Sequence, residues 1–133
     1  MNKATNRQTL YYKMGGESSL KALVETFYDI VETDPDGEPV HVLHLQGFGV
    51  NHLRQAQFEF LSGFFGGPQL YIEKTGHSNL RLMHEHVEIG AVERDSWLLC
   101  MEKAIDKVGF EAEIKDQLMQ GFTRSAEVLK NRD

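Results

Sequence analysis

Cysteine is nearly absent from this sequence, and the one that occurs, Cys100, restricts the chemistry open to the chain. A single cysteine excludes a disulfide within the chain, and it cannot build a thiolate metal cage alone. Cys100 lies in the apolar string 97–101, and free cysteines are among the most often buried residues. We therefore expect Cys100 to be a buried structural thiol.

Basic charge is also scarce. The 14 Lys and Arg are outnumbered by 20 Asp and Glu, which gives a formal net charge of −6. The basic residues form no cluster on any expected helix face. Because phosphate backbones attract proteins through concentrated positive charge, we expect no nucleic-acid partner.

Long apolar runs are missing as well. No stretch approaches the roughly 18 to 20 apolar residues that a bilayer span requires, so we expect no membrane partner. Residues 1–14 lack the apolar core of a signal peptide. These two observations together predict a cytoplasmic protein.

Four segments do show the period of an amphipathic helix, and none alternates as a strand does. With 133 residues and 41% hydrophobic content, the chain can bury one core. We predict one all-α domain over residues 1–133, in which residues 1–10 form a loose N-terminal extension. The buried faces are expected to comprise Leu20, Leu23, Val24, Phe27, Tyr28 and Val31; Val50, Leu53, Gln57, Phe60, Leu61 and Phe64; Val92, Trp97, Cys100, Met101, Ala104 and Val108; and Ile114, Leu118, Phe122, Ser125 and Leu129.

Glycine and proline are expected to set the limits of these helices. The first helix should begin after Gly15 and Gly16, with Ser18 or Ser19 as its cap. Segment 34–39 contains two of the three prolines and a glycine, which predicts a loop. The Gly-Gly-Pro sequence at 66–68 should end the second helix.

Between residues 70 and 90 the periodicity is weak, so we predict a loop with one short helix around 79–84. A large apolar cofactor such as haem, clamped between helix pairs, would supply the packing that this segment lacks. His84 has the setting of an axial haem ligand, with His77 and His86 nearby. From the residues alone two alternatives stay open: an ordinary partly buried histidine, and a zinc site, for which a fourth ligand at a familiar spacing is missing.

Gln57 interrupts the apolar face of the second long helix. A buried carboxamide costs about 1 to 3 kcal/mol if its polar atoms stay unpaired. We therefore expect Gln57 to have a polar partner, either a neighbouring tyrosine or a bound ligand.

Four parts of the sequence resemble the group II truncated globins, the short 2-on-2 helical branch of the globins. They are Gly15-Gly16-Glu17; Phe27-Tyr28; Phe60-Leu61 followed by Gly66-Gly67-Pro68 and Tyr71; and Gly76-His77 through Leu80-Arg81 and His84 to residues 93–101. Their order and spacing match the family from about residue 10 to residue 128. The resemblance implies a 2-on-2 helical sandwich around haem b.

The resemblance also implies roles for single residues. The proximal ligand of the iron falls on His84. The pocket that receives the gas is implied to contain Tyr28, His44, Leu53, Gln57 and Trp97. The implied haem contacts are Phe60, Phe64, Tyr71, Lys74, His77, Arg81, His84 and Trp97, of which Lys74, His77 and Arg81 are expected on the propionate side.

The chain departs from the family pattern around the expected iron ligand. Met83 stands where a basic residue often precedes the proximal histidine, and Glu85-His86-Val87 replaces x-Pro-Phe. Ser78 and Leu45 replace two further prolines of the pattern. His86 could in principle compete for the iron, but we favour His84 because it keeps the alignment on both sides.

His44 is expected in a loop that moves more readily than a packed helix. We therefore expect it, or Tyr28 as tyrosinate, to supply a sixth iron ligand when no gas is bound. His41 and His52 are rivals for the position of His44.

The implied function is binding of oxygen, carbon monoxide or nitric oxide. Each hydrogen bond from the pocket to a charged acceptor is worth about 1.5 to 3 kcal/mol, and about 1.4 kcal/mol changes a dissociation constant tenfold. Two such hydrogen bonds would make release of the gas slow by a factor of hundreds. Slow release favours sensing, or redox detoxification of oxygen, nitric oxide or peroxide, over oxygen delivery. A peroxidase or nitric oxide dioxygenase activity would need a reductase that the sequence does not identify. A haem-free helical interaction module is the remaining alternative.

Overall fold

The computed structural model describes residues 9–46, 50–76 and 89–130. These three ranges are helical and contain no strand, as the sequence predicts. The elements, in chain order, are α2 (Leu10–Lys13), α3 (Gly16–Thr33), the 3-10 helix η1 (Pro35–Gly37), α4 (Glu38–Gln46), α5 (Val50–Phe64), α6 (Leu70–Thr75), α8 (Ala91–Val108) and α9 (Ala112–Leu129).

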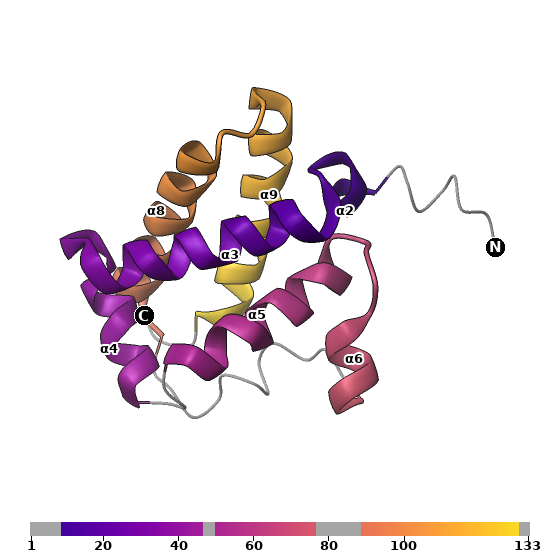
Figure 1. Ribbon diagram of the computed structural model, residues 1–133. Coiled ribbons are helices and arrows are strands. Elements are labelled where there is room, and N and C mark those ends of the chain that lie inside the picture. Colours follow the sequence, from indigo (N-terminus) through magenta and orange to yellow (C-terminus); the bar gives the residue numbers. More distant parts are fainter. Residues whose placement is uncertain (1–8, 47–49, 77–88, 131–133) are drawn as a thin grey trace.

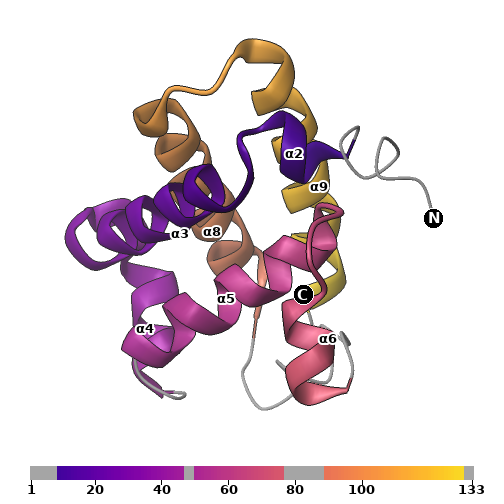
Figure 2. The same cartoon turned by 45° about the vertical axis from the view of Figure 1, so that its right-hand side comes forward.

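The four long helices α3, α5, α8 and α9 correspond to the four expected helices, and α3 lies at their centre. It packs against both α5 and α8, while α8 packs against α9 (Figure 1). The short helices α4 and α6 lie at opposite ends of α5 (Figure 2). In the described part of the chain, no helix is long and apolar enough to cross a membrane.

The start of α3 differs from the expected cap. Gly15 is the N-terminal capping residue, and its φ of 119° lies in the left-handed region, which glycine adopts without steric cost. Ser18 and Ser19 lie within the first turn of the helix, and no side chain caps it. The expectation of a serine cap is therefore wrong, because a sharp glycine turn positions the helix instead.

The loop predicted over 34–39 is also wrong. Pro35 is the first residue of η1, and Pro39 lies in the first turn of α4. A proline in the first turn removes no helical hydrogen bond, so both prolines start helices rather than interrupt them. His44 consequently belongs to a helix rather than to a mobile loop.

Helix α5 ends where the sequence predicts, at Phe64, and the chain turns through Gly66 and Gly67. A side chain at Gly67 would overlap the ring of Tyr11, with a Cβ only 2.5 Å from the nearest ring atom. The turn is anchored by the Thr9 hydroxyl, which donates to the Gly66 carbonyl at 3.1 Å. The loose segment expected over 1–10 thus does not extend to Thr9 and Leu10.

Helix α6 was not expected from the weak periodicity after residue 70. It has six residues, and Gly76 ends it in the left-handed region. The short helix predicted around 79–84 lies outside the described residues.

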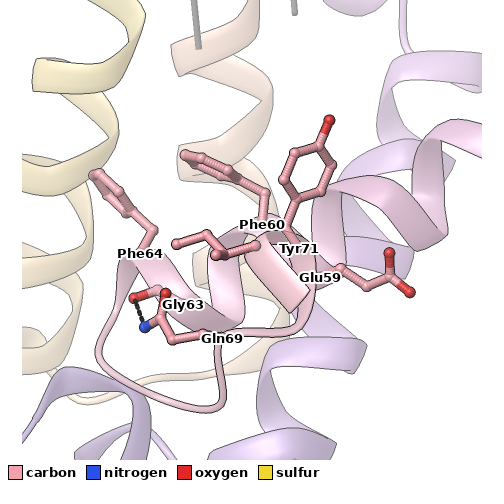
Figure 3. Close-up of a pocket in the computed structure, with 7 residues that line it drawn as sticks. Glu59, Phe60, Gly63, Phe64, Gln69 and Tyr71 are labelled. Atoms are coloured by element: carbon pink, nitrogen blue, oxygen red, sulfur yellow. Dashed lines mark hydrogen bonds between the residues drawn. The ribbon is translucent and has the colours of Figure 1, made fainter. Parts of the chain in front are cut away.

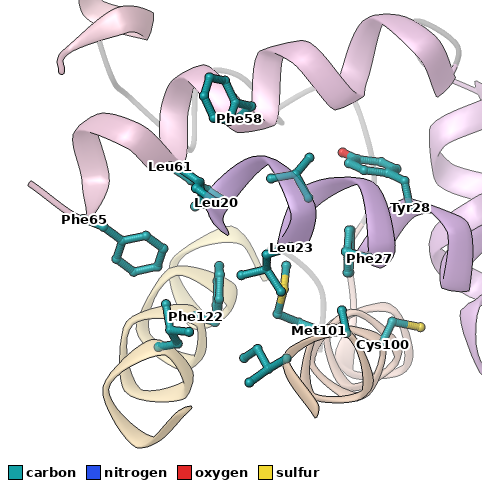
Figure 4. Close-up of a cluster of buried hydrophobic side chains, with 14 of the residues drawn as sticks. Leu20, Leu23, Phe27, Tyr28, Phe58, Leu61, Phe65, Cys100, Met101 and Phe122 are labelled. Carbon is teal, nitrogen blue, oxygen red and sulfur yellow. The ribbon is translucent and has the colours of Figure 1, made fainter. Parts of the chain in front are cut away.

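The core lies between α3, α5, α8 and α9, and Figure 4 shows its side chains. Cys100 is fully buried, as expected for a structural thiol. On the same helix Ile105 is fully buried although it was not expected to face inward. Val92, which was expected inside, is 66% exposed. It lies in the first turn of α8.

Candidate functional site

Two polar side chains, Tyr28 on α3 and Gln57 on α5, face each other between these helices. Tyr28 is only 2% exposed, and its hydroxyl donates a hydrogen bond to Gln57 Oε1 at 2.8 Å. Figure 4 shows the Tyr28 ring at the edge of the core, next to Phe27. The expectation that Gln57 has a polar partner is confirmed.

Burial favours the protonated form of the Tyr28 hydroxyl. Removal from water disfavours the phenolate, and this raises the pKa of Tyr28 well above its ordinary value of 10.0, although the positive charge of Arg54 acts in the opposite direction. Tyr28 is therefore a hydrogen-bond donor throughout the neutral pH range.

The amide nitrogen of Gln57 is the second polar feature of this site. It is buried and has no hydrogen-bond partner among the described residues. An unsatisfied buried donor costs about 1 to 3 kcal/mol, so native proteins rarely leave one without a purpose. Tyr28 and Gln57 together hold three donor hydrogens, and the bond between them uses one. The pair can therefore donate to a small acceptor that enters the site.

Leu53, Trp97 and His44 are the other residues expected in this pocket. Leu53 lies one turn before Gln57 on α5 and packs against the core. Trp97 on α8 is partly buried, and its ring centroid lies 5.2 Å from that of Phe27. Phe27 in turn contacts the Tyr28 ring at 5.1 Å, so one phenylalanine connects Trp97 with the polar pair. The side chain of His44 lies outside the described residues.

Three of the expected haem contacts form an aromatic cluster on α5 and α6. The rings of Phe60 and Phe64 are stacked with their centroids 5.7 Å apart, and Tyr71 meets Phe60 edge-on at 6.0 Å. They line a pocket of about 180 Å³ together with Glu59, Gly63, Gln69 and Ile72 (Figure 3). Figure 3 shows the three rings on the same side of these helices. This side offers an apolar aromatic surface.

The expected propionate partners are only partly described. Lys74 lies in the last turn of α6, and its Nζ pairs with Glu59 Oε2 at 3.2 Å. His77, Arg81 and His84 lie outside the described residues, as does the rival ligand His86. The sequence did not reveal Glu59 as a competitor for the charge of Lys74.

Arg54, which the sequence did not indicate as a site residue, joins α5 to α3 beside Tyr28. Its partners are the carboxylates of Glu25, Asp29 and Glu32. Their spacing of four and three residues is visible in the sequence and places them on one helix face. That spacing could have indicated a basic partner, but not which one.

The sequence of this chain is similar to those of known bacterial globins. A sequence profile of the bacterial-like globin family matches residues 9–131. The group 2 truncated haemoglobin YjbI of Bacillus subtilis (strain 168) is 36% identical over 121 residues, which are 91% of this chain and 88% of that protein.

Solved structures show the same similarity. The group II 2-on-2 haemoglobin from the plant pathogen Agrobacterium tumefaciens has a TM-score of 0.87 at 32% identity, covering 94% of this chain and 95% of that one. The truncated oxygen-avid haemoglobin from Bacillus subtilis has a TM-score of 0.80 at 34% identity, covering 93% of this chain and 100% of that one.

These matches extend over nearly the whole chain, and they confirm both the resemblance and the 2-on-2 globin fold. The globin family implies a haem cofactor. The aromatic cluster of α5 and α6 and the buried donor of Gln57 suit such a group and its ligand. The chain belongs to the bacterial-like globin family and, within it, to the group II truncated haemoglobins.

Proposed function

We propose that this protein binds oxygen and related diatomic gases at a haem b whose iron is held by His84, and that Tyr28 and Gln57 retain the gas by hydrogen bonds. The observation that carries the proposal is the buried Gln57 amide nitrogen, which has no partner among the described residues. A diatomic ligand with partial negative charge would accept a hydrogen bond from it.

The residues of the chain fit the cofactor. Phe60, Phe64 and Tyr71 offer an apolar aromatic surface, and burying apolar area stabilises by about 25 cal/mol per Å². A bound haem supplies an iron centre that coordinates the gas. Lys74, with His77 and Arg81, would hold the propionates, for which Lys74 must exchange its pairing with Glu59.

The hydrogen-bond chemistry of the pocket favours retention over delivery. Tyr28 is held protonated by burial, and its bond to Gln57 Oε1 leaves the amide hydrogens directed elsewhere. Two hydrogen bonds from the remaining donor hydrogens of this pair to the gas would slow its release by a factor of a hundred or more. We therefore propose sensing, or detoxification of oxygen, nitric oxide or peroxide with the help of a separate reductase, as the use of the site. The oxygen avidity named for the B. subtilis structure supports this direction.

The test is the rate at which oxygen leaves the ferrous protein. Tyr28→Phe and Gln57→Leu should each accelerate oxygen dissociation roughly tenfold or more, because each removes a donor or its support. Gln55→Leu is the matched control, since Gln55 is an exposed glutamine on the same helix and bonds to Glu59. Tyr28→Phe and Gln57→Leu rates equal to the control would contradict the proposal, and a purified protein without a Soret band would favour a haem-free module.

A further inference from the structure

Arg54 is a charged side chain with an unusual degree of enclosure. Only 18% of it is exposed, although it lies on a helix of the protein surface. Its guanidinium pairs with Glu25, with Asp29 at 3.0 Å and with Glu32 at 3.0 Å, all three on the neighbouring helix α3. A planar guanidinium can bind several carboxylates at once, so this one side chain joins α5 to nearly two turns of α3.

The same guanidinium lies over the Tyr28 ring, with its central carbon 5.6 Å from the ring centroid. Gln57 follows Arg54 by three residues on α5 and therefore lies on the same helix face. Helices α3 and α5 are thus joined at two adjacent points, by the Arg54 ion pairs and by the bond from the Tyr28 hydroxyl to Gln57. The Tyr28 side chain lies at both points, because its ring is next to the Arg54 guanidinium and its hydroxyl bonds to Gln57.

We propose that Arg54 is a positioning residue for the gas pocket: its clamp on α3 holds the Tyr28 ring so that the hydroxyl stays aligned with the Gln57 amide. The proposal rests on the proposed function of these two donors. Hydrogen bonds weaken steeply with misalignment, so a small shift of α5 along α3 would weaken the donors without removing them. Arg54 would thereby set how tightly the pocket retains its ligand.

A direct electrostatic effect of Arg54 on a bound gas is the weaker explanation. One guanidinium faces three carboxylates, so the cluster as a whole is not a positive centre. The action of Arg54 is therefore geometric. A lysine keeps the charge, but its compact ammonium lacks the rigid planar fork of a guanidinium, so Arg54→Lys should retain only part of the function.

The experiment compares Arg54→Gln and Arg54→Lys with Arg94→Gln in the haem-loaded protein. Arg94 is the matched control because it is 20% exposed and also joins two helices, through Glu127. Arg54→Gln should accelerate oxygen dissociation roughly three- to tenfold, and Arg54→Lys less. Arg54→Gln should also shift the C–O stretching frequency of the carbon monoxide complex. Arg94→Gln should lower the urea midpoint of unfolding to a similar extent but leave both ligand readouts at wild-type values.

The double variant Arg54→Gln with Tyr28→Phe separates the mechanisms. If Arg54 acts through Tyr28, its replacement adds no further acceleration once the hydroxyl is absent. Equal acceleration in both backgrounds, or an unchanged rate in Arg54→Gln, would overturn the inference. Should Arg54→Gln fail to fold, Glu32→Gln weakens the same clamp from the α3 side and must change the rate in the same direction. A wild-type rate in Tyr28→Phe alone would contradict the proposed function, and the inference with it.

Discussion

Burial raises the pKa of two weakly acidic side chains in this protein. Tyr28 and Cys100 both ionise to anions, and removal from water disfavours an anion unless a partner compensates. The consequence differs with position. Tyr28 lies beside Gln57, so its retained proton makes a hydrogen bond. Cys100 is fully buried in the core, so its retained proton makes the thiol inert.

The thiol of Cys100 should resist alkylation in the native protein. Burial, reinforced by the negative charge of Asp34, raises its pKa from 9.0 to about 11. The thiolate fraction at about pH 8 is then about a hundredfold below that of an ordinary cysteine, before access is considered. Iodoacetamide labelling followed by mass spectrometry should show modification only in concentrated urea. Rapid labelling without urea would contradict the burial of this side chain.

Single residues also show how far the sequence could predict the site. Gln57 was recognisable because a carboxamide on an apolar face needs a partner, and Tyr28 is that partner. Arg54 was not, because an arginine on an amphipathic helix is usually solvated and its carboxylate partners lie more than twenty residues away. Pairing across helices depends on their relative placement, which local spacing does not contain.

At the scale of elements, length separates what the sequence predicts from what it does not. The helices α3, α5, α8 and α9 have 15 or 18 residues each, enough for several repeats of the helical period. Helix α6 has only six residues, and α4 carries Pro39 in its first turn, so neither shows a clear stripe. Short helices form mainly through contacts with their neighbours.

A small polar clasp joins η1 to α8. Lys103 Nζ contacts Asp34 Oδ2 at 3.0 Å and Asp36 Oδ2 at 2.6 Å. The Ser96 hydroxyl donates to the Asp36 carbonyl at 2.6 Å. Because Trp97 follows Ser96 directly, the clasp helps to fix the part of α8 that faces Phe27.

The stability that the clasp provides should depend on pH in a definite direction. The Asp36 backbone N–H and the Lys103 ammonium lower the pKa of Asp34 below its ordinary value of 3.8. Its contribution is therefore fully present above about pH 3.8 and is lost as the pH falls through the lower, folded-state pKa. Hydrogen bonds to Asp36 and Asp34 raise the pKa of Lys103 from 10.5, so its contribution is present below 10.5 and is lost only at higher pH.

We therefore expect Asp34→Asn to lower the urea midpoint of unfolding at neutral pH. The difference from wild type should shrink as acid protonates Asp34 in the wild-type protein. Asp116→Asn, which removes an exposed carboxylate on α9, controls for the change in net charge. A difference between Asp34→Asn and wild type that stays constant to the lowest pH at which both fold would show that Asp34 ionisation does not stabilise the clasp.

At the scale of the whole molecule, the apolar side chains of the described residues range from fully buried to substantially exposed. Leu20 on α3, and Leu118 and Phe122 on α9, have no exposed surface. By contrast, Phe64 is 37% exposed and Ile72 is 39% exposed, next to the aromatic pocket. Covering exposed apolar area lowers the free energy of the folded protein, so a flat apolar cofactor on the aromatic side of α5 and α6 would stabilise it.

The stability of the whole protein should depend on whether haem, and therefore its iron ligand, is in place. A group that binds only the folded chain stabilises it by mass action, about 2.7 kcal/mol at a hundredfold excess over its dissociation constant. His84, the ligand implied by the family resemblance, lies outside the described residues, and its role stays a prediction. His84→Ala should lose the Soret band on gel filtration and unfold at the lower temperature of the haem-free protein, while His86→Ala keeps both wild-type properties. The reverse pattern would place the iron on His86, since only the true ligand couples haem retention to the thermal midpoint.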